Sequence, residues 1–557
     1  MHMHAGNLLG LGIAINGATS NIIVYLIRKY NVKSIDAAQI SNIVNGCVNV
    51  APVVGATVSD AYFGCYPVVA CASAVAFLVV TKLLSSLHLN RRHPVAAAFA
   101  VFTELKLMRT AVVGPVRGAI HRSGPTCDRN RGTRFNSATM GANQFDKTQE
   151  LDIFFNWFFI LLYGSLIVGA TVVVYIQDSV GWALGFGLCT VATAVSVVAL
   201  LLGSRYYRRP KAQGSPFMGL AQVAAAAARK RKINLLDKGR LDYYYGTADA
   251  ADVAISPPTE SFRHTVIEDH LLFVYFLLRL QLSEPCCSDT NGDIHRDGSI
   301  AQPWHLCTVQ QVEDFKTLVR ILPLWTTSIF VSVSIGIQVS MTILQALTVD
   351  RSLGRHFTVP AGSISVSNLA AVVVSIILLD RFLFPLCNKL THYTLTPLQR
   401  IGLGHVINTI GMAASALMER KRAAIVHAHH AENQAAWIAP MSVLWLVLPL
   451  AVVGVGEALH FPGQVGLYYQ EFPKALKSTA TGMASLTVAL GFYLSTAVVG
   501  LVRRVTTWLP DNLNDSRLEN VYWMLAAVGT VNFGYYVLCA KLYEYHSIVK
   551  DEEAVAN

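Results

Sequence analysis

The chain has 557 residues, of which 53% are apolar and only 14% charged, and its formal net charge is +10. This composition and a mean hydropathy of +0.43 exclude a soluble multidomain protein and indicate a protein of the lipid bilayer. The ten cysteines form no C-x-x-C pair, so the sequence predicts neither a disulfide framework nor a metal site.

Apolar runs of about 20 residues, the length that crosses about 30 Å of hydrocarbon, recur along the chain. Eleven runs fit this description: 8–27, 37–58, 66–87, 154–176, 182–203, 318–344, 361–384, 401–417, 439–460, 481–502 and 521–542. No small-residue cleavage site follows the first run. We therefore expect a retained helix there and not a signal peptide.

The polar segment 204–316 predicts the orientation of the chain. Its first part, 204–240, holds ten Lys or Arg against one acidic residue, which favours the cytoplasmic side. A solvated loop beside anionic lipid explains these basic residues better than nucleic-acid binding does. Six runs follow the segment, so the C-terminus is expected in the cytoplasm. A cytoplasmic N-terminus requires an even number of helices before the segment, yet only five runs are visible.

The missing helix is expected between residues 87 and 154, where the sequence reads GAIHRSGPTCDRNRGTRF (118–135). A charged residue at the bilayer centre costs about 3 kcal/mol. One lipid-facing helix cannot carry His121, Arg122, Asp128, Arg129 and Arg131 together. This segment is not expected to insert as a normal membrane helix.

Four long segments resemble the plant nitrate and peptide transporter family (NPF), the proton-dependent oligopeptide transporter group of the major facilitator superfamily. They are AQISNIVNGCVNVAPVVGATVSDAYFG (38–64), GTRFNSATMGANQFDKTQELDIFFNWFF (132–159), LPLWTTSIFVSVSIGIQVSMTILQALTVDR (322–351) and GEALHFPGQVGLYYQEFPKALKSTATGM (456–483). The likeness is closest to the nitrate-excretion branch and covers nearly the whole chain apart from about 90–131 and parts of the central loop. It implies an all-α major facilitator fold of two six-helix bundles, with twelve transmembrane helices.

The resemblance also implies the domain organisation. An N-terminal six-helix half is expected at 1–203, a basic cytoplasmic linker at 204–316, a C-terminal six-helix half at 317–545 and a cytoplasmic tail at 546–557. Both termini are expected in the cytoplasm of a multi-pass protein of the plasma membrane.

Members of the family carry an apolar stretch that ends in a Gly-Thr-Gly-like turn before GTRF. Codons exist for 121–131 that, read one base later, give Thr-Ala-Ala-Ala-Leu-Leu-Ala-Ile-Gly-Thr-Gly, a membrane helix that enters such a turn. We therefore interpret part of 90–131 as an out-of-frame reading that disrupts the fourth helix. A genuine polar re-entrant loop that lines a cavity is the alternative.

Two ionisable residues of the expected spans, Arg134 and Glu457, align with the basic cavity residue of the family's helix 4 and the cavity acid of its helix 10. An ionisable group at such depth indicates a functional site. A planar guanidinium suits a planar oxyanion such as nitrate. The alternative for Glu457 is an ion pair that only holds two helices together.

Uncharged amides extend the expected substrate site, which also takes Asn45 and Gln338. Asn45 belongs to a stripe along one face of the second helix: Gln39, Asn42, Asn45 and Asn49. Such amides either line a wet cavity that binds a small solute or form hydrogen bonds between helices.

The segment GATVSDAYFG resembles the family's loop motif, in which an acid and glycines let two helices approach and lock one face of the carrier. Asp60 is then the gating charge, and Gly55 and Gly64 allow the approach. Cys65 and Tyr66 replace the usual basic residues, which predicts a weaker lock.

Two family features are absent. Leu8, Leu11 and Gly12 stand where proton-coupled members carry E-x-x-E-R, and no carboxylate precedes Asp36, so coupling to protons is not expected. Ile335 stands nearest to the family's nitrate-binding histidine.

The expected function is transport of nitrate, with chloride also credible, by efflux or at low affinity. The alternatives are a carrier of peptides, hormones or glucosides, and a non-transporting receptor or inactive product. No enzyme motif occurs, and neither an enzyme nor a cofactor is expected. A glycosylation sequon, Asn514-Asp515-Ser516, falls in a loop predicted to face outward.

Overall fold

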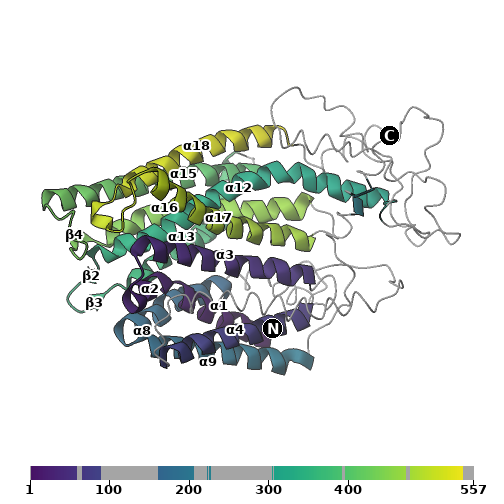
Figure 1. The fold of residues 1–557 in the computed structure, drawn as a ribbon. Coiled ribbons are helices and arrows are strands. Elements are labelled where there is room, and N and C mark those ends of the chain that lie inside the picture. Colours follow the sequence, from purple (N-terminus) through teal and green to yellow (C-terminus); the bar gives the residue numbers. More distant parts are fainter. Residues whose placement is uncertain are drawn as a thin grey trace, which may run out of the picture.

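The computed structural model describes residues 2–58, 65–88, 161–205, 222–223, 225–226, 304, 306–391, 395–471 and 477–543. They form long helices that run in one general direction, with short strands at one end (Figure 1). The helices of the first 205 residues lie on one side of the molecule, and those after residue 308 lie on the other. The expected arrangement of two helical halves is therefore visible in the described residues.

The N-terminal half has five described spans. A bend of 44° separates α1 from α2, which together form one of them. The elements are α1 (His2–Thr19), α2 (Ile22–Tyr30), α3 (Ser34–Val58), α4 (Cys65–His88), the span Leu161–Ser179 with its π turn η2 (Gly169–Val173) and α8 (Val174–Ser179), α9 (Trp182–Leu202) and the short η3 (Gly203–Arg205). The expected fourth helix, and with it the anomalous 90–131, lies outside the described residues.

The C-terminal half has six spans, as predicted. They are α12 (Val309–Leu347); η6 (Ala361–Ser365), α13 (Val366–Leu378), η7 (Leu379–Leu383) and α14 (Phe384–Thr391) as one span; α15 (Pro397–Ala428); α16 (Leu444–Glu471); α17 (Lys477–Val505); and α18 (Leu518–Lys541). A short η9 (Leu513–Asp515) lies between the last two helices.

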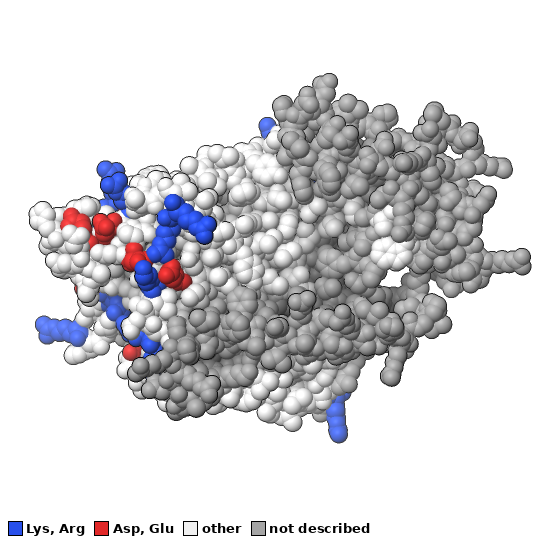
Figure 2. Space-filling model, in the orientation of Figure 1, with Lys and Arg blue, Asp and Glu red and all other residues white. Residues whose placement is uncertain are grey.

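Four short strands lie at one end of the molecule. β1 (Val349–Asp350) pairs in parallel with β4 (Ala439–Ser442), and β2 (Ser352–Leu353) pairs with β3 (Phe357–Thr358) as an antiparallel hairpin. We call this end the hairpin face and define it by residues 31–33, 179–181, 348–360, 429–443 and 506–517. On the side drawn in Figure 2, charged side chains gather at this end.

Helix length and composition confirm a membrane protein. Within the described ranges, eight helices are long and apolar enough to cross a bilayer, and the bent pair α1–α2 would be a ninth. Large apolar side chains such as Val191, Val195 and Val198 of α9 are more than half exposed. In water this exposure would be costly, but in lipid it is the expected outer surface.

Local signals explain where several helices start and stop. Thr308 and Gln311 form a capping box, in which each side chain bonds the other's backbone N–H, so α12 begins at Val309 inside the range expected for the linker. Thr396 caps α15 in the same way, and Pro397 occupies its first position. The expected run 439–460 is wrong at its start, because residues 439–442 form β4 and the helix begins at Leu444.

The two halves share one apolar core near the hairpin face. Ile23 and Leu26 of α2 and Ile35 of α3 pack in the same buried cluster as Ile337 and Met341 of α12. Deeper in the molecule, α3 lies along α17, where a Cβ on Gly46 would come within 2.9 Å of the Tyr493 ring. These contacts close the hairpin face over the interior.

Candidate functional site

Glu457 lies at the middle of α16, thirteen residues after Leu444 and fourteen before Glu471. At 1.5 Å per residue this is about 20 Å from either end of the helix. The half-buried carboxylate accepts a hydrogen bond from Asn368 Nδ2 of α13 at 3.1 Å. Both helices belong to the C-terminal half.

Tyr163 brings the N-terminal half to the same place. It belongs to the span Leu161–Ser179, packs on the cluster that includes Val372 and Ala458, and interacts electrostatically with Glu457. An acid at mid-depth, faced by both halves, is the arrangement expected of a transporter's central site. The sequence analysis did not select Asn368 or Tyr163, because both are uncharged residues whose partners lie on other helices.

Two other predicted substrate residues, Gln338 and Asn45, form hydrogen bonds with groups other than Glu457. Gln338 of α12 is fully buried, and its Nε2 donates to Ser415 Oγ of α15 at 2.8 Å, within the C-terminal half. Asn45 Nδ2 donates to Ser41 O of its own helix at 3.0 Å. No hydrogen bond among the described residues joins Asn45, Gln338 and Glu457 to one another.

The amide stripe of α3 divides into two pairs. Near the hairpin face, Asn42 Nδ2 donates to Ser340 Oγ of α12 at 3.3 Å, and Gln39 exchanges long hydrogen bonds of 3.4 Å with Thr496 of α17. Asn45 and Asn49 instead bond carbonyls of the preceding turn. The first pair therefore joins the halves, while the second does not bond another helix.

The start of α1 is packed inside its own half. A Cβ on Gly12 would lie 2.0 Å from Ser165 Oγ, so the glycine allows α1 to approach the span Leu161–Ser179 closely. Leu8 is buried. Two of the three positions aligned with the E-x-x-E-R motif thus serve packing.

Four further expectations concern residues without described side chains. Arg134, Asp60 and Gly64 lie outside the described residues, and Gly55 lies within α3. Their assignments to substrate binding and gating stay predictions.

Charged side chains join the halves at the hairpin face. Arg503 of α17 pairs with Asp36 of α3 at 2.6 Å, and Lys33 pairs with Asp511 at 2.6 Å. Arg503 also contacts Asp511. The hydrogen bond from Lys33, together with the charge of Arg503, holds the pKa of the Asp511 carboxyl below its usual range.

A second set of charges links the hairpin to the N-terminal half. Arg351 Nη1 lies 3.8 Å from Asp178 Oδ2, and Arg28 contacts the same carboxylate. Beside it, Ser363 Oγ donates to Ala170 O at 2.8 Å. Two separate sets of ion pairs and hydrogen bonds therefore join the halves at this end of the molecule.

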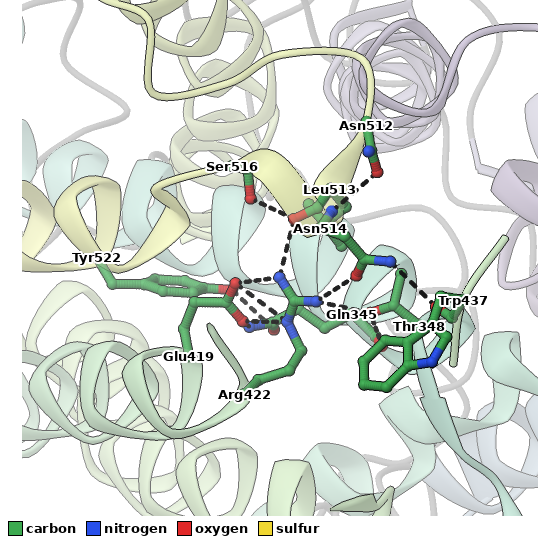
Figure 3. Close-up of polar contacts among 10 residues, drawn as sticks. All are labelled: Gln345, Thr348, Glu419, Arg422, Trp437, Asn512, Leu513, Asn514, Ser516 and Tyr522. Carbon is green, nitrogen blue, oxygen red and sulfur yellow. Dashed lines mark hydrogen bonds and ion pairs between the residues drawn. The ribbon is translucent and has the colours of Figure 1, made fainter. Parts of the chain in front are cut away.

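A buried ion pair lies just beneath the hairpin face within the C-terminal half (Figure 3). Glu419 and Arg422 of α15 are 0% and 1% exposed and pair at 2.6 Å. Glu419 also accepts from Gln345 Nε2 of α12 at 2.6 Å, and Gln345 accepts from the Tyr522 hydroxyl of α18 at 3.2 Å. The pair thus fastens three helices together.

The five N–H donors of the Arg422 guanidinium all have acceptors. Nε and one Nη2 hydrogen go to Glu419, and the second Nη2 hydrogen goes to Leu513 O at 2.9 Å. Nη1 donates to Thr348 Oγ1 at 3.3 Å and to Asn514 Oδ1 at 2.9 Å. The pair therefore also holds the loop before α18.

Asn514 of the predicted sequon is part of this network. Its side chain is 3% exposed, and its Nδ2 donates to Gln434 O at 2.9 Å and Trp437 O at 3.0 Å. The amide group is thus fully engaged in contacts between two loops of the hairpin face.

A second buried polar cluster lies farther along α15. The rings of His405 and His460 of α16 are 5.0 Å apart, and the residues are 1% and 0% exposed. Asn532 Nδ2 of α18 bonds His405 Nδ1 at 3.3 Å and Thr327 O of α12 at 2.9 Å. Among the residues that the structure describes, five polar atoms of this cluster have no hydrogen-bond partner: His405 Nε2, His460 Nδ1, His460 Nε2, Asn408 Oδ1 and Asn532 Oδ1.

One pattern in the sequence predicts both the Glu419–Arg422 pair and the histidine cluster. Buried polar residues follow one face of α15 at separations of three, seven, four and three: His405, Asn408, Ser415, Glu419 and Arg422. Helical spacing of this kind marks a face turned toward protein. The predicted apolar run 401–417 is shorter than the helix, because α15 runs to Ala428.

Two helical halves that close at one end over a carboxylate at mid-depth define a membrane transporter of the major facilitator type. Comparisons with known proteins agree. The family profile described as POT family matches residues 132–523. Two proteins of Arabidopsis thaliana, Protein NRT1/ PTR FAMILY 2.3 and 2.7, are 41% and 42% identical to this chain; the matches cover 98% and 99% of the chain and 92% and 93% of those proteins.

Solved structures agree on the fold. A crystal structure of an auto-inhibited POT family peptide transporter matches with a TM-score of 0.67 at 15% identity, covering 97% of this chain and 96% of the other. The POT family transporter PepTSo matches with a TM-score of 0.64 at 15% identity, covering 98% of each chain. The chain belongs to the POT family, as its resemblance to NPF predicted. Members are secondary transporters, so it is a multi-pass transporter and not an enzyme.

Proposed function

We propose that the chain moves nitrate, with chloride as a competing anion, by alternating access across the plasma membrane. The observation that carries the proposal is the position of Glu457, at the middle of α16 and faced by Asn368 of its own half and Tyr163 of the other. A carboxylate there requires a cation, and Arg134 is the cation that the family alignment supplies. Arg134, once released from Glu457, would offer one positive charge to one anion.

The hydrogen bond that Glu457 already accepts favours a small anion over a zwitterion. Asn368 already donates to Glu457, so the carboxylate is partly satisfied within its own half. An entering nitrate would accept hydrogen bonds from the Arg134 guanidinium, which offers several coplanar donors. Release of Arg134 from Glu457 would then accompany substrate entry.

The composition of α1 supports transport that is not coupled to protons through that helix. Leu8, Leu11 and Gly12 offer no carboxylate, and Gly12 is packed on Ser165. We therefore propose efflux or low-affinity transport down a gradient. The orientation that follows from the basic linker puts the hairpin face outside and both termini in the cytoplasm.

Alternating access requires the hairpin face to open. It requires separation of the Lys33–Asp511 and Arg503–Asp36 pairs and of the shared apolar core beside them. In this scheme the hairpin face is closed while the site opens toward the cytoplasm. Gly55, Asp60 and Gly64 would lock the opposite end.

Transport by purified protein in liposomes tests the proposal. Equilibrium exchange of labelled nitrate, chloride and a dipeptide would be measured for the native chain and for Arg134→Gln and Glu457→Gln, with exposed Asp515→Asn as a control. Loss of a hydrogen bond to a charged group costs about 1.5–3 kcal/mol, so Arg134→Gln should lower nitrate exchange about 10- to 100-fold. Glu457→Gln should preserve or raise nitrate binding, because a negative charge is removed.

Two other outcomes would contradict the proposal. Exchange of the dipeptide alone, lost in both variants, would assign the site to zwitterions such as peptides, for which Arg134 and Glu457 bind opposite charges. Folded protein without exchange of any solute would assign the chain to the receptor or inactive class, as a damaged fourth helix predicts.

A further inference from the structure

The cluster of His405 and His460 differs from an ordinary packed core by its unpaired atoms. Buried polar atoms in proteins nearly always have a hydrogen-bond partner. Here both ring nitrogens of His460, one of His405 and the side-chain oxygens of Asn408 and Asn532 have none within the described residues. A group of neighbouring unpaired donors and acceptors forms a binding site for water, because a water molecule can both donate and accept hydrogen bonds.

We propose that His405 and His460 form a water-reached proton-binding site that controls the charge opposite Glu457. His460 lies three residues after Glu457 on α16, so the two side chains are neighbours on one face of that helix. A proton on His460 would give Glu457 a cationic partner within its own half.

The hydrogen bonds indicate which nitrogen accepts the proton. The amide nitrogen of Asn532 can only donate, so His405 Nδ1 accepts from it, and the proton of neutral His405 is then on Nε2. Neutral His460 has one lone pair on a ring nitrogen, and no described group bonds it. Protonation breaks an O–H bond of a hydronium ion and forms an N–H bond there, adding one positive charge.

The groups around the pair allow this charge. The titratable neighbours are Glu457 on α16 and Tyr536 of α18, whose ring stacks on His405 at 4.7 Å. On α15, Arg400 packs against Gly463, but its guanidinium lies over the Phe384 ring at 4.1 Å.

The remaining elements contribute uncharged partners. α12 offers the Thr327 carbonyl, which bonds Asn532, and α13 offers Asn368, which bonds Glu457. Tyr163 of the N-terminal half faces the carboxylate. An imidazolium at residue 460 therefore has one carboxylate close by, and its charge would neutralise the group that opposes anion binding.

The proton site can be tested without transport. Deuterium exchange at the imidazole C2–H, measured by mass spectrometry on the intact detergent-solubilised protein from pH 5 to 8, reports the protonation of each histidine separately. Exposed His356 of the hairpin is the internal reference. We expect His405 and His460 to exchange, at rates that follow a titration within this range. If neither histidine exchanges above background while His356 exchanges fully, the proposal is overturned, because this is the result expected of a pair that water does not reach.

The effect on transport rests on the proposed function. Nitrate exchange with equal pH on both sides of the liposome should rise several-fold from pH 7.5 to 5.5 in the native chain and in the matched control His356→Gln. His460→Gln and His405→Gln should show a flat profile, and an unchanged profile in both would overturn the link to Glu457. Native protein that exchanges no nitrate at any pH would refute the proposed function, while the C2 exchange would still decide whether the histidines bind protons.

Discussion

Two buried polar clusters share α15 and differ in how completely they are paired. At the hairpin end, every N–H of the Arg422 guanidinium has an acceptor, and Glu419 accepts from both α12 and α15. Nearer the middle, both ring nitrogens of His460 are unpaired. Their exposed fractions, 1% for Arg422 and 0% for His460, are nearly equal. The two clusters therefore differ in the completeness of their pairing and not in their burial.

Pairing matters for stability because a buried polar group that loses its partner raises the free energy of the folded state. Removing one member of a buried ion pair leaves an uncompensated charge, while removing a group that lacks partners leaves little behind. The two clusters should therefore respond in opposite ways to apolar substitution. Four predictions follow from this contrast, in order of expected size.

The largest effect is expected for Arg422→Met, which leaves the Glu419 carboxylate buried without its ion-pair partner. Breaking such a pair costs about 3–5 kcal/mol, so the unfolding temperature in detergent should fall sharply, as measured by size-exclusion chromatography after heating. Arg420→Met, at an exposed position two residues earlier, is the control. The double variant Arg422→Met/Glu419→Leu should recover most of the loss, and an equal loss in the double variant would contradict the explanation.

A smaller loss is expected for Asn514→Ala. This change removes one acceptor of Arg422 and both donors to the Gln434 and Trp437 carbonyls. Unpaired buried groups cost about 1–3 kcal/mol. The same heating assay should place this variant between the native chain and Arg422→Met. Exposed Asp515→Asn, in the same sequon, should match the native protein, and equal stability of all three would show that the loop is not held by Asn514.

His460→Phe sharpens the contrast directly. The ring is kept against His405 and Phe461, and no hydrogen bond to a described protein group is lost, so the expected loss of stability is below about 1 kcal/mol. Thermal unfolding of this variant beside Arg422→Met provides the comparison. A loss as large as that of Arg422→Met would mean that the imidazole has strong partners and that the two clusters do not differ.

The smallest effect is expected at the ion pairs of the hairpin face. Lys33 and Asp511 have side chains 63% and 42% exposed, and exposed pairs contribute at most about 1 kcal/mol. The pKa of Asp511 is lowered in the folded protein, so its contribution is complete above the unfolded pKa of about 3.9 and is lost as the pH falls through the lower folded value. The stability difference between the native chain and Asp511→Asn should thus be constant from pH 5 to 8, with Arg355→Gln of the hairpin as the control. A change within that range would show that another group titrates at this face.

The sequence predicted the helical spans well because each span must be apolar over a fixed length to lie in lipid. It did not predict which polar groups meet, since this depends on the packing of helices distant in the sequence. The predicted apolar run 401–417 ends before Glu419. The helix continues because this pair is satisfied internally and because the Lys421 amine lies 3.4 Å from the centre of the Trp445 ring.

For the candidate site, the alignment with the family identified Glu457, but neither hydropathy nor spacing identified Tyr163 or Asn368. These residues belong to two other spans and are identified by their contacts with Glu457. Such contacts cannot be predicted from the sequence of one span. Gln338 shows the converse difficulty. Its amide fits a solute-binding stripe in the sequence, yet its nitrogen bonds Ser415 of a neighbouring helix. The roles of Arg134 and Asp60 stay predictions.

The engagement of Asn514 has a consequence for biosynthesis. An oligosaccharide is attached to the amide nitrogen of a sequon asparagine, and here that nitrogen donates to two carbonyls of the opposite loop. A chain that received the sugar during translocation could not dock this loop. A glycan at this position would therefore label copies arrested before assembly, and mature copies would be free of it.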